Sequence, residues 1–103
     1  MHEPTYKCVL TDNYLTITYR TFCWVPRKVV ARVTELLVRN GTLPEAAEQE
    51  AIEMLSCAAV EAAQDEYEYK LWWHPGGHIH YFIADYEEIA IDEGYTECFE
   101  GTY

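Results

Sequence analysis

The sequence YEYKLWWHPGGHIHYFIAD, residues 67–85, alternates apolar with polar side chains on both sides of a Pro-Gly-Gly turn. Alternation with a period of two is typical of β-strands that bury one face, and a glycine-rich turn joins antiparallel neighbours. The pattern predicts a hairpin formed by residues 67–74 and 78–85. The apolar face of this hairpin consists of Tyr67, Tyr69, Leu71, Trp73, Ile79, Tyr81 and Ile83.

A second hairpin is predicted at the amino-terminal end of the chain. Residues 5–10 and 14–22 alternate in the same way. Between them, Thr11-Asp12-Asn13 has the composition of a turn, since Asp and Asn bond to their own backbone and tolerate left-handed conformations. The positions expected to face inward are Tyr6, Cys8, Leu10, Leu15, Ile17 and Tyr19.

Two helices are predicted between the hairpins. Pro26 suits the first turn of a helix, and an apolar stripe follows at helical spacing until Asn40-Gly41 ends it. Residues 42–45, Thr-Leu-Pro-Glu, have the form of a capping box that begins a second, alanine-rich helix running to about Gln64. The stripe of the first helix comprises Val29, Val30, Val33, Leu36 and Leu37.

The remainder of the chain completes the expected architecture. Residues 88–92 fit a further short strand, and residues 95–103 fit either a last edge strand or an ordered tail. Hairpins impose antiparallel pairing, and the two helices must cover one face of the sheet. We therefore expect an α+β fold: a two-layer antiparallel sheet with two helices packed on one face, in the order β-β-α-α-β-β with one more strand. Residues 1–103 are expected to form a single domain.

The electric charge is divided unevenly along the chain. Residues 1–44 hold six basic and three acidic side chains, a net charge of +3. Residues 45–103 hold fifteen acidic side chains and one basic, Lys70, a net charge of −14, so that the whole chain has −11. Such a field repels nucleic acid and anionic membranes and attracts basic surfaces. We therefore expect a basic protein as the partner, with no direct binding to nucleic acid or membrane.

Composition and motifs argue against several other classes. No segment has the pattern of a signal peptide or a membrane span, so we expect the protein in the cytoplasm of the host cell. Cys8, Cys23, Cys57 and Cys98 form no C-x-x-C pair and are expected to be buried thiols. The nucleophile, phosphate-binding, metalloprotease and dinucleotide motifs are absent, and a serine occurs only once. We expect no enzymatic activity and no cofactor.

The segment from His74 to His80 concentrates the nitrogen atoms that could bind a metal. If the turn has three residues, His74 pairs with His78, and His74, His78 and His80 share one face within reach of a zinc or nickel ion. If the turn has two residues, His74 lies on the opposite face. The spacing matches no strong zinc signature, so a metal-binding module is an alternative hypothesis and a solvated hairpin tip is the default.

Residues 85–103 contain seven acidic side chains and no basic one, interleaved with aromatic residues. A row of carboxylates can compete for the Lys and Arg side chains of a nucleic-acid-binding channel, and Tyr side chains suit the desolvated centre of an interface. The alternative is a solvated surface, or acids that turn toward the basic residues of the first helix. The predicted partner-binding residues are Asp85, Tyr86, Glu87, Glu88, Asp92, Glu93, Tyr95, Glu97, Glu100 and Tyr103.

In size and charge alone, the chain resembles the small acidic inhibitors that phages and mobile elements direct against nucleic-acid enzymes, such as anti-CRISPR and anti-restriction proteins. The resemblance implies an inhibitor that covers a basic groove and blocks access of DNA or RNA. Two alternatives stay open besides metal binding. One is an immunity protein or antitoxin that neutralises a basic nuclease or toxin, and the other is a homo-oligomeric structural protein. The residues leave the oligomeric state undecided.

Overall fold

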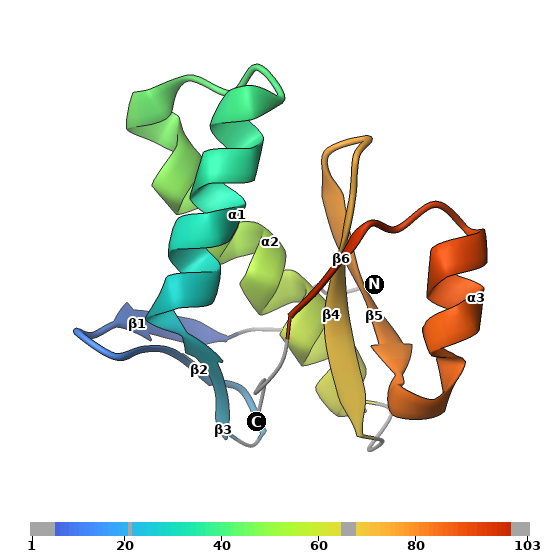
Figure 1. The fold of residues 1–103 in the computed structure, drawn as a ribbon. Helices are drawn as coiled ribbons and strands as arrows, with labels where there is room; N and C mark the ends of the chain where they lie inside the picture. Colours follow the sequence, from blue (N-terminus) through green and yellow to red (C-terminus); the bar gives the residue numbers. More distant parts are fainter. Residues whose placement is uncertain (1–5, 21, 65–67, 100–103) are drawn as a thin grey trace, which may run out of the picture.

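The computed structural model describes residues 6–20, 22–64 and 68–99, and Figure 1 shows their arrangement. The elements follow the expected order, with additions at three points. They are β1 (Lys7–Leu10), β2 (Tyr14–Thr18), β3 (Phe22–Pro26), α1 (Arg27–Arg39), α2 (Pro44–Gln64), β4 (Tyr69–His74), β5 (His78–Ile83), the 3₁₀ turn η1 (Ala84–Tyr86), α3 (Glu87–Asp92) and β6 (Glu97–Phe99).

The α+β class, the antiparallel pairing and the two main helices are confirmed. The strands, however, form two three-stranded sheets, ordered β1-β2-β3 and β5-β4-β6. Each sheet is built from strands that are close in sequence, and α1 and α2 lie between the two groups along the chain. In Figure 1, α2 runs through the middle of the molecule, beside α1 and between the sheets.

The predicted second strand, residues 14–22, is wrong in its extent. β2 ends at Thr18, the chain turns, and β3 begins at Phe22, which is the register partner of Thr18. Cys23 and Val25 point into the core, while Phe22 and Trp24 are exposed, so β3 has its own period-two pattern. Pro26 ends this strand at the edge of the sheet, where a missing N–H removes no bond from the ladder.

The predicted strand at residues 88–92 is also wrong, because this segment lies in the helix α3. Ile89 and Ile91 suggested a buried strand face, yet both are exposed and the buried residue is Ala90 between them. Glu87 and Glu88 occupy the first turn of α3, where the partial positive charge of a helix end stabilises carboxylates. By contrast, the expected edge strand near the carboxyl end is confirmed by β6, which pairs with β4.

One core cluster joins both sheets to α1 and α2. The small side chains on α2 let the neighbouring elements approach it closely. The predicted end of α1 is also confirmed: Gly41 has φ 106°, and the N–H of Thr42 donates to the carbonyl of Leu37 at 2.9 Å. The buried residues of α2 are Ala47, Ala51, Leu55, Ser56, Ala58, Ala59, Val60 and Ala62.

All four cysteines are free thiols, but they are not uniformly buried as expected. Cys23 is buried, Cys8 and Cys98 are partly buried, and Cys57 is exposed. Two of them link α2 to β1 and to the residue before it. Cys8 Sγ lies 3.0 Å from Ser56 Oγ, and Cys57 Sγ lies 3.2 Å from Tyr6 Oη. Within the described residues, no helix combines the length and the apolar character that a membrane crossing requires.

Candidate functional site

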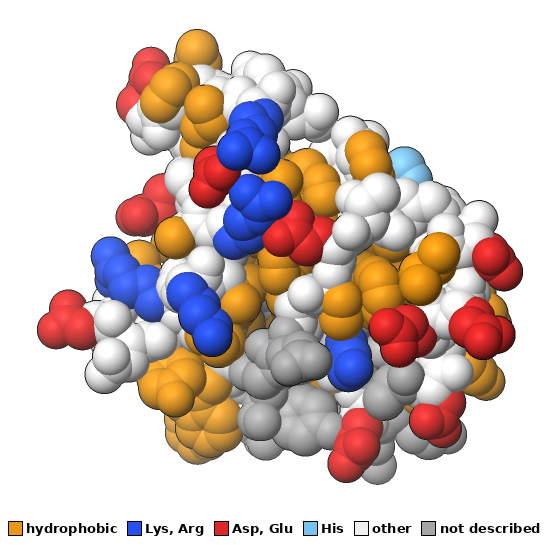
Figure 2. Space-filling model, in the orientation of Figure 1, with side chains coloured by type: hydrophobic (Ala, Val, Ile, Leu, Met, Phe, Trp, Pro, Cys, Tyr) orange, Lys and Arg blue, Asp and Glu red, His pale blue; other side chains and the backbone are white. Residues whose placement is uncertain are grey.

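The acidic segment after β5 forms an outward-facing surface on η1 and α3. Five of the predicted partner-binding carboxylates are exposed here, and Figure 2 shows acidic side chains gathered over this end of the molecule. We call the exposed side chains of residues 85–93 the α3 surface. Its carboxylates are those of Asp85, Glu87, Glu88, Asp92 and Glu93.

Apolar side chains are exposed between these carboxylates. Tyr86 is 48% exposed, Ile89 is 46% exposed and Ile91 is 57% exposed. Large aliphatic and aromatic groups at the surface of a short helix are typical of an interface, because they gain most from being covered by a partner. The sequence patterns placed Ile89 and Ile91 on a buried strand, so these two were not among the predicted partner-binding residues. Their interleaving with acids was the available signal.

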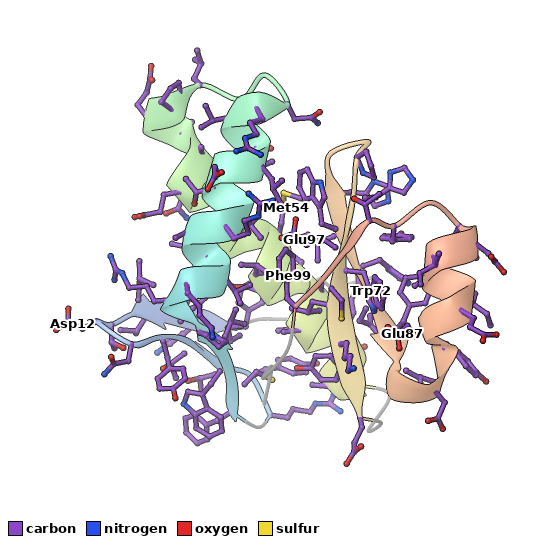
Figure 3. All side chains as sticks on the ribbon, viewed as in Figure 1. Asp12, Met54, Trp72, Glu87, Glu97 and Phe99 are labelled. Carbon is purple, nitrogen blue, oxygen red and sulfur yellow. The ribbon has the colours of Figure 1, made fainter. Side chains whose placement is uncertain are left out.

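A small second core holds α3 against the outer face of the β4–β5 hairpin. Ala90 is fully buried there and lies in one cluster with Trp72 and Phe82, against which Tyr95 and Cys98 pack. Trp72 lies between the hairpin and α3 in Figure 3. The rings of Trp72 and Phe82 meet edge to face at 6.4 Å. The small Ala90 side chain therefore sets a close approach, and the rest of α3 faces outward.

The carboxylates of the α3 surface have no ion-pair partner among the residues that the structure describes. The ion pairs among the described residues join Arg32 to Glu35 and Glu97, and Arg39 to Glu35. Most of the negative charge near the carboxyl end is therefore not neutralised by the first helix.

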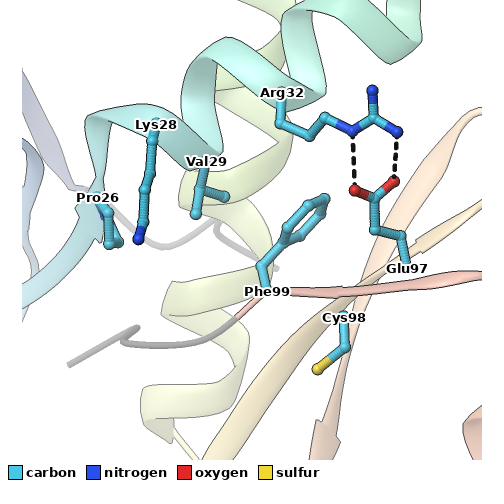
Figure 4. Close-up of a pocket in the computed structure, with 7 residues that line it drawn as sticks. All are labelled: Pro26, Lys28, Val29, Arg32, Glu97, Cys98 and Phe99. Atoms are coloured by element: carbon cyan, nitrogen blue, oxygen red, sulfur yellow. Dashed lines mark hydrogen bonds and ion pairs between the residues drawn. The ribbon is translucent and has the colours of Figure 1, made fainter.

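Glu97 is the exception, because its carboxylate is paired within the chain. Its carboxylate accepts two bonds from the Arg32 guanidinium, at 2.8 Å from Nε and 3.2 Å from Nη2 (Figure 4). This pairing raises the pKa of Arg32, chiefly through the hydrogen bond to Glu97. The physical reason is the register of β6, in which Glu97 pairs with Trp73 and comes beside α1.

Tyr95 was predicted to anchor a partner, but the structure uses it as an internal contact. Its hydroxyl lies 3.1 Å from His78 Nε2, and its ring packs edge to face on Phe82 at 5.0 Å. Burial, followed by the charge of Glu93, raises the pKa of Tyr95. The two remaining predicted residues, Glu100 and Tyr103, lie outside the described residues.

The hairpin turn has three residues, which settles the geometry of the histidines. His74 pairs with His78 and Trp72 pairs with His80, so the three imidazoles lie on one face. The rings of His74 and His78 stack at 4.5 Å, and the N–H of Gly76 donates to His74 Nδ1 at 2.9 Å. Burial and the charges of His74 and His80 lower the pKa of His78. Across residues 6–20, 22–64 and 68–99, no three His, Cys, Asp or Glu side chains are placed to hold a metal ion.

An open hollow of about 630 Å³ lies between α1 and β6 (Figure 4). Pro26, Val29 and Phe99 form its apolar part. Lys28, Arg32, Glu97 and Cys98 complete its lining. Arg32 and Glu97 bond to each other, so these two are not aimed at a ligand.

No protein-family model, curated protein or solved structure matches this chain. The function is therefore inferred from the geometry and charge of the site itself.

Proposed function

We propose that the protein is a small acidic inhibitor that binds a basic nucleic-acid-binding surface of an enzyme complex and blocks access of DNA or RNA. The observation that carries this proposal is the α3 surface, where five exposed carboxylates, none of them ion-paired with another described residue, lie among Tyr86, Ile89 and Ile91. Phosphate contacts dominate the affinity of such enzymes for nucleic acid, so carboxylates can compete for the same Lys and Arg side chains.

The carboxylates are arranged on a helix, where the sequence pattern favoured a strand. Glu88 and Asp92 are four residues apart, which places their Cα atoms roughly 6 Å apart along the helix axis. They therefore lie on the same side of α3, one turn apart. Two such groups can contact neighbouring cations of a partner at the same time.

The exposed apolar side chains are expected to slow dissociation of the partner, which the charges alone do not. Charge complementarity mainly accelerates association and selects the partner, while desolvated apolar contacts slow dissociation. Ile89 and Ile91 would enter apolar gaps between the basic side chains of the partner. The acids and the isoleucines are thus expected to affect different kinetic constants.

The test uses a panel of purified DNA and RNA enzymes with labelled substrates. We expect the wild-type protein to inhibit at least one of them by preventing substrate binding, and Glu87→Lys/Glu88→Lys to abolish the inhibition. The control is Glu48→Lys/Glu61→Lys on the exposed face of α2, because each pair changes the net charge from −11 to −7. Equal loss with the control variant would show that only total charge matters. Absence of inhibition across the panel would refute the proposal.

A further inference from the structure

The outer face of the sheet β1-β2-β3 exposes a second apolar surface. Phe22 is 54% exposed and Trp24 is 41% exposed on β3, where their rings stack at a centroid distance of 5.9 Å. The register places Thr16 opposite both Trp24 and the exposed Val9, and Tyr14 opposite Pro26. These side chains form a continuous strip across three strands. We call it the sheet surface, consisting of Lys7, Val9, Tyr14, Thr16, Thr18, Phe22, Trp24 and Pro26.

Basic side chains border the sheet surface. Lys7 is exposed in the same cross-strand row as Thr18 and Phe22. At the other end, Arg27 and Lys28 border an open hollow of about 510 Å³, which Asp12, Asn13, Tyr14 and Pro26 also line. Arg27 Nη1 also donates to the backbone carbonyl of Thr11 at 2.7 Å. Figure 2 shows basic side chains over this part of the molecule, and Figure 3 places Asp12 at the tip of the neighbouring turn.

We infer that the sheet surface binds the α3 surface of a second copy of this chain. The two surfaces are complementary in charge, because three cations and one acid, Asp12, border one surface and carboxylates surround the other. They also match in kind, since each exposes large apolar side chains that an interface would cover. Tyr86 or Ile89 of one copy would enter the hollow beside Tyr14, with Glu87 and Glu88 facing Arg27 and Lys28.

The two surfaces cannot meet within one molecule. The sheet β1-β2-β3 and α3 lie at opposite sides of the structure, separated by α2 and the β4–β5 hairpin (Figure 1). Binding between different patches is heterologous, so each bound pair leaves one surface of each kind open for another copy. A symmetric contact between two sheet surfaces would bring like charges, including those of Lys7, toward each other, which complementarity disfavours.

This inference does not depend on the proposed inhibitory function, and two variants test it by complementation. Phe22→Thr/Trp24→Thr removes the aromatic strip with residues that suit an exposed strand. Glu87→Lys/Glu88→Lys reverses charge on the α3 surface. In analytical ultracentrifugation from micromolar to millimolar concentration, we expect the mass of the wild type to rise and each variant alone to remain monomeric, with association weakened at least about tenfold. Circular dichroism checks that both variants fold.

The decisive sample is the equimolar mixture of the two variants, in which only one productive contact remains. We expect a one-to-one complex that grows no further. A monomeric wild type at all concentrations, or a mixture that fails to associate, would overturn the inference. So would binding of the sheet surface to single-stranded oligonucleotide without self-association. Enzyme inhibition by Phe22→Thr/Trp24→Thr tests the proposed function separately, since this variant retains the α3 surface.

Discussion

Replacing Phe82 by alanine removes the ring at the centre of the cluster that holds α3. Phe82 is 9% exposed and its ring meets Trp72 at 6.4 Å and Tyr95 at 5.0 Å. Truncation of a buried Phe to Ala costs about 3–5 kcal/mol, and the residual exposure of Phe82 places it near the lower value, about 3 kcal/mol. With a urea m-value of about 2 kcal/mol/M, the unfolding midpoint would fall by roughly 1.5 M.

The matched variant is Ile91→Ala, which removes apolar atoms from the outer side of the same helix. Ile91 is 57% exposed, so we expect a change in the free energy of unfolding within about 0.5 kcal/mol. Urea unfolding measures both variants, and hydrogen exchange of residues 87–95 reports whether α3 stays docked. Phe82→Ala should accelerate exchange in α3, while Ile91→Ala should not. Equal destabilisation by the two variants would refute the division of α3 into a docked side and a partner-binding side.

Three further outcomes follow from the contacts that position the site. Glu97→Gln removes the charge from a half-exposed pair with Arg32, so the urea midpoint should fall, but clearly less than with Phe82→Ala. The pKa of His78 lies below its ordinary value in the folded state, so the unfolded chain binds more protons and stability should fall as the pH drops below about 6.5. Urea unfolding at about pH 7.5 and pH 5 measures this fall, and His78→Gln should remove the share of it that His78 causes. Gly94 has φ 96°, and a Cβ there would lie 3.2 Å from His74 Nε2, so Gly94→Ala should lower stability by about 1 kcal/mol or more, and an unchanged melting temperature would contradict this.

Local patterns were sufficient for the elements whose burial follows their period. The β4–β5 hairpin alternates around Pro-Gly-Gly except at Trp72 and Phe82, which α3 covers, and α1 keeps its apolar stripe up to Gly41, so the bounds of both match the structure closely. The same logic failed at residues 87–92. There, Ile89 and Ile91 are two residues apart, as on one face of a strand, but both are exposed and only Ala90 is buried. An alternating pattern identifies a strand only when its apolar members are buried, and a single sequence does not show that.

In the candidate site too, some features follow from the local sequence and others depend on tertiary contacts. Exposure of Glu87 and Glu88 could be expected from charge density alone. The ion pair of Glu97 with Arg32 could not be expected from the sequence. The two residues are 65 positions apart and meet only through the pairing of β6 with β4. The role of Tyr95 likewise depends on His78, which the three-residue turn places on the same face.

Geometry also explains why the basic residues of α1 do not neutralise the α3 surface. Arg32 is occupied by Glu35 and Glu97, and Arg39 by Glu35. α3 lies across the β4–β5 hairpin from α1, so its carboxylates face away from that helix (Figure 1). At physiological ionic strength, exposed charges interact over about 8 Å, so attraction across the hairpin is screened. The acids of α3 are therefore available to another molecule, and the basic border of the sheet surface is available for the same reason.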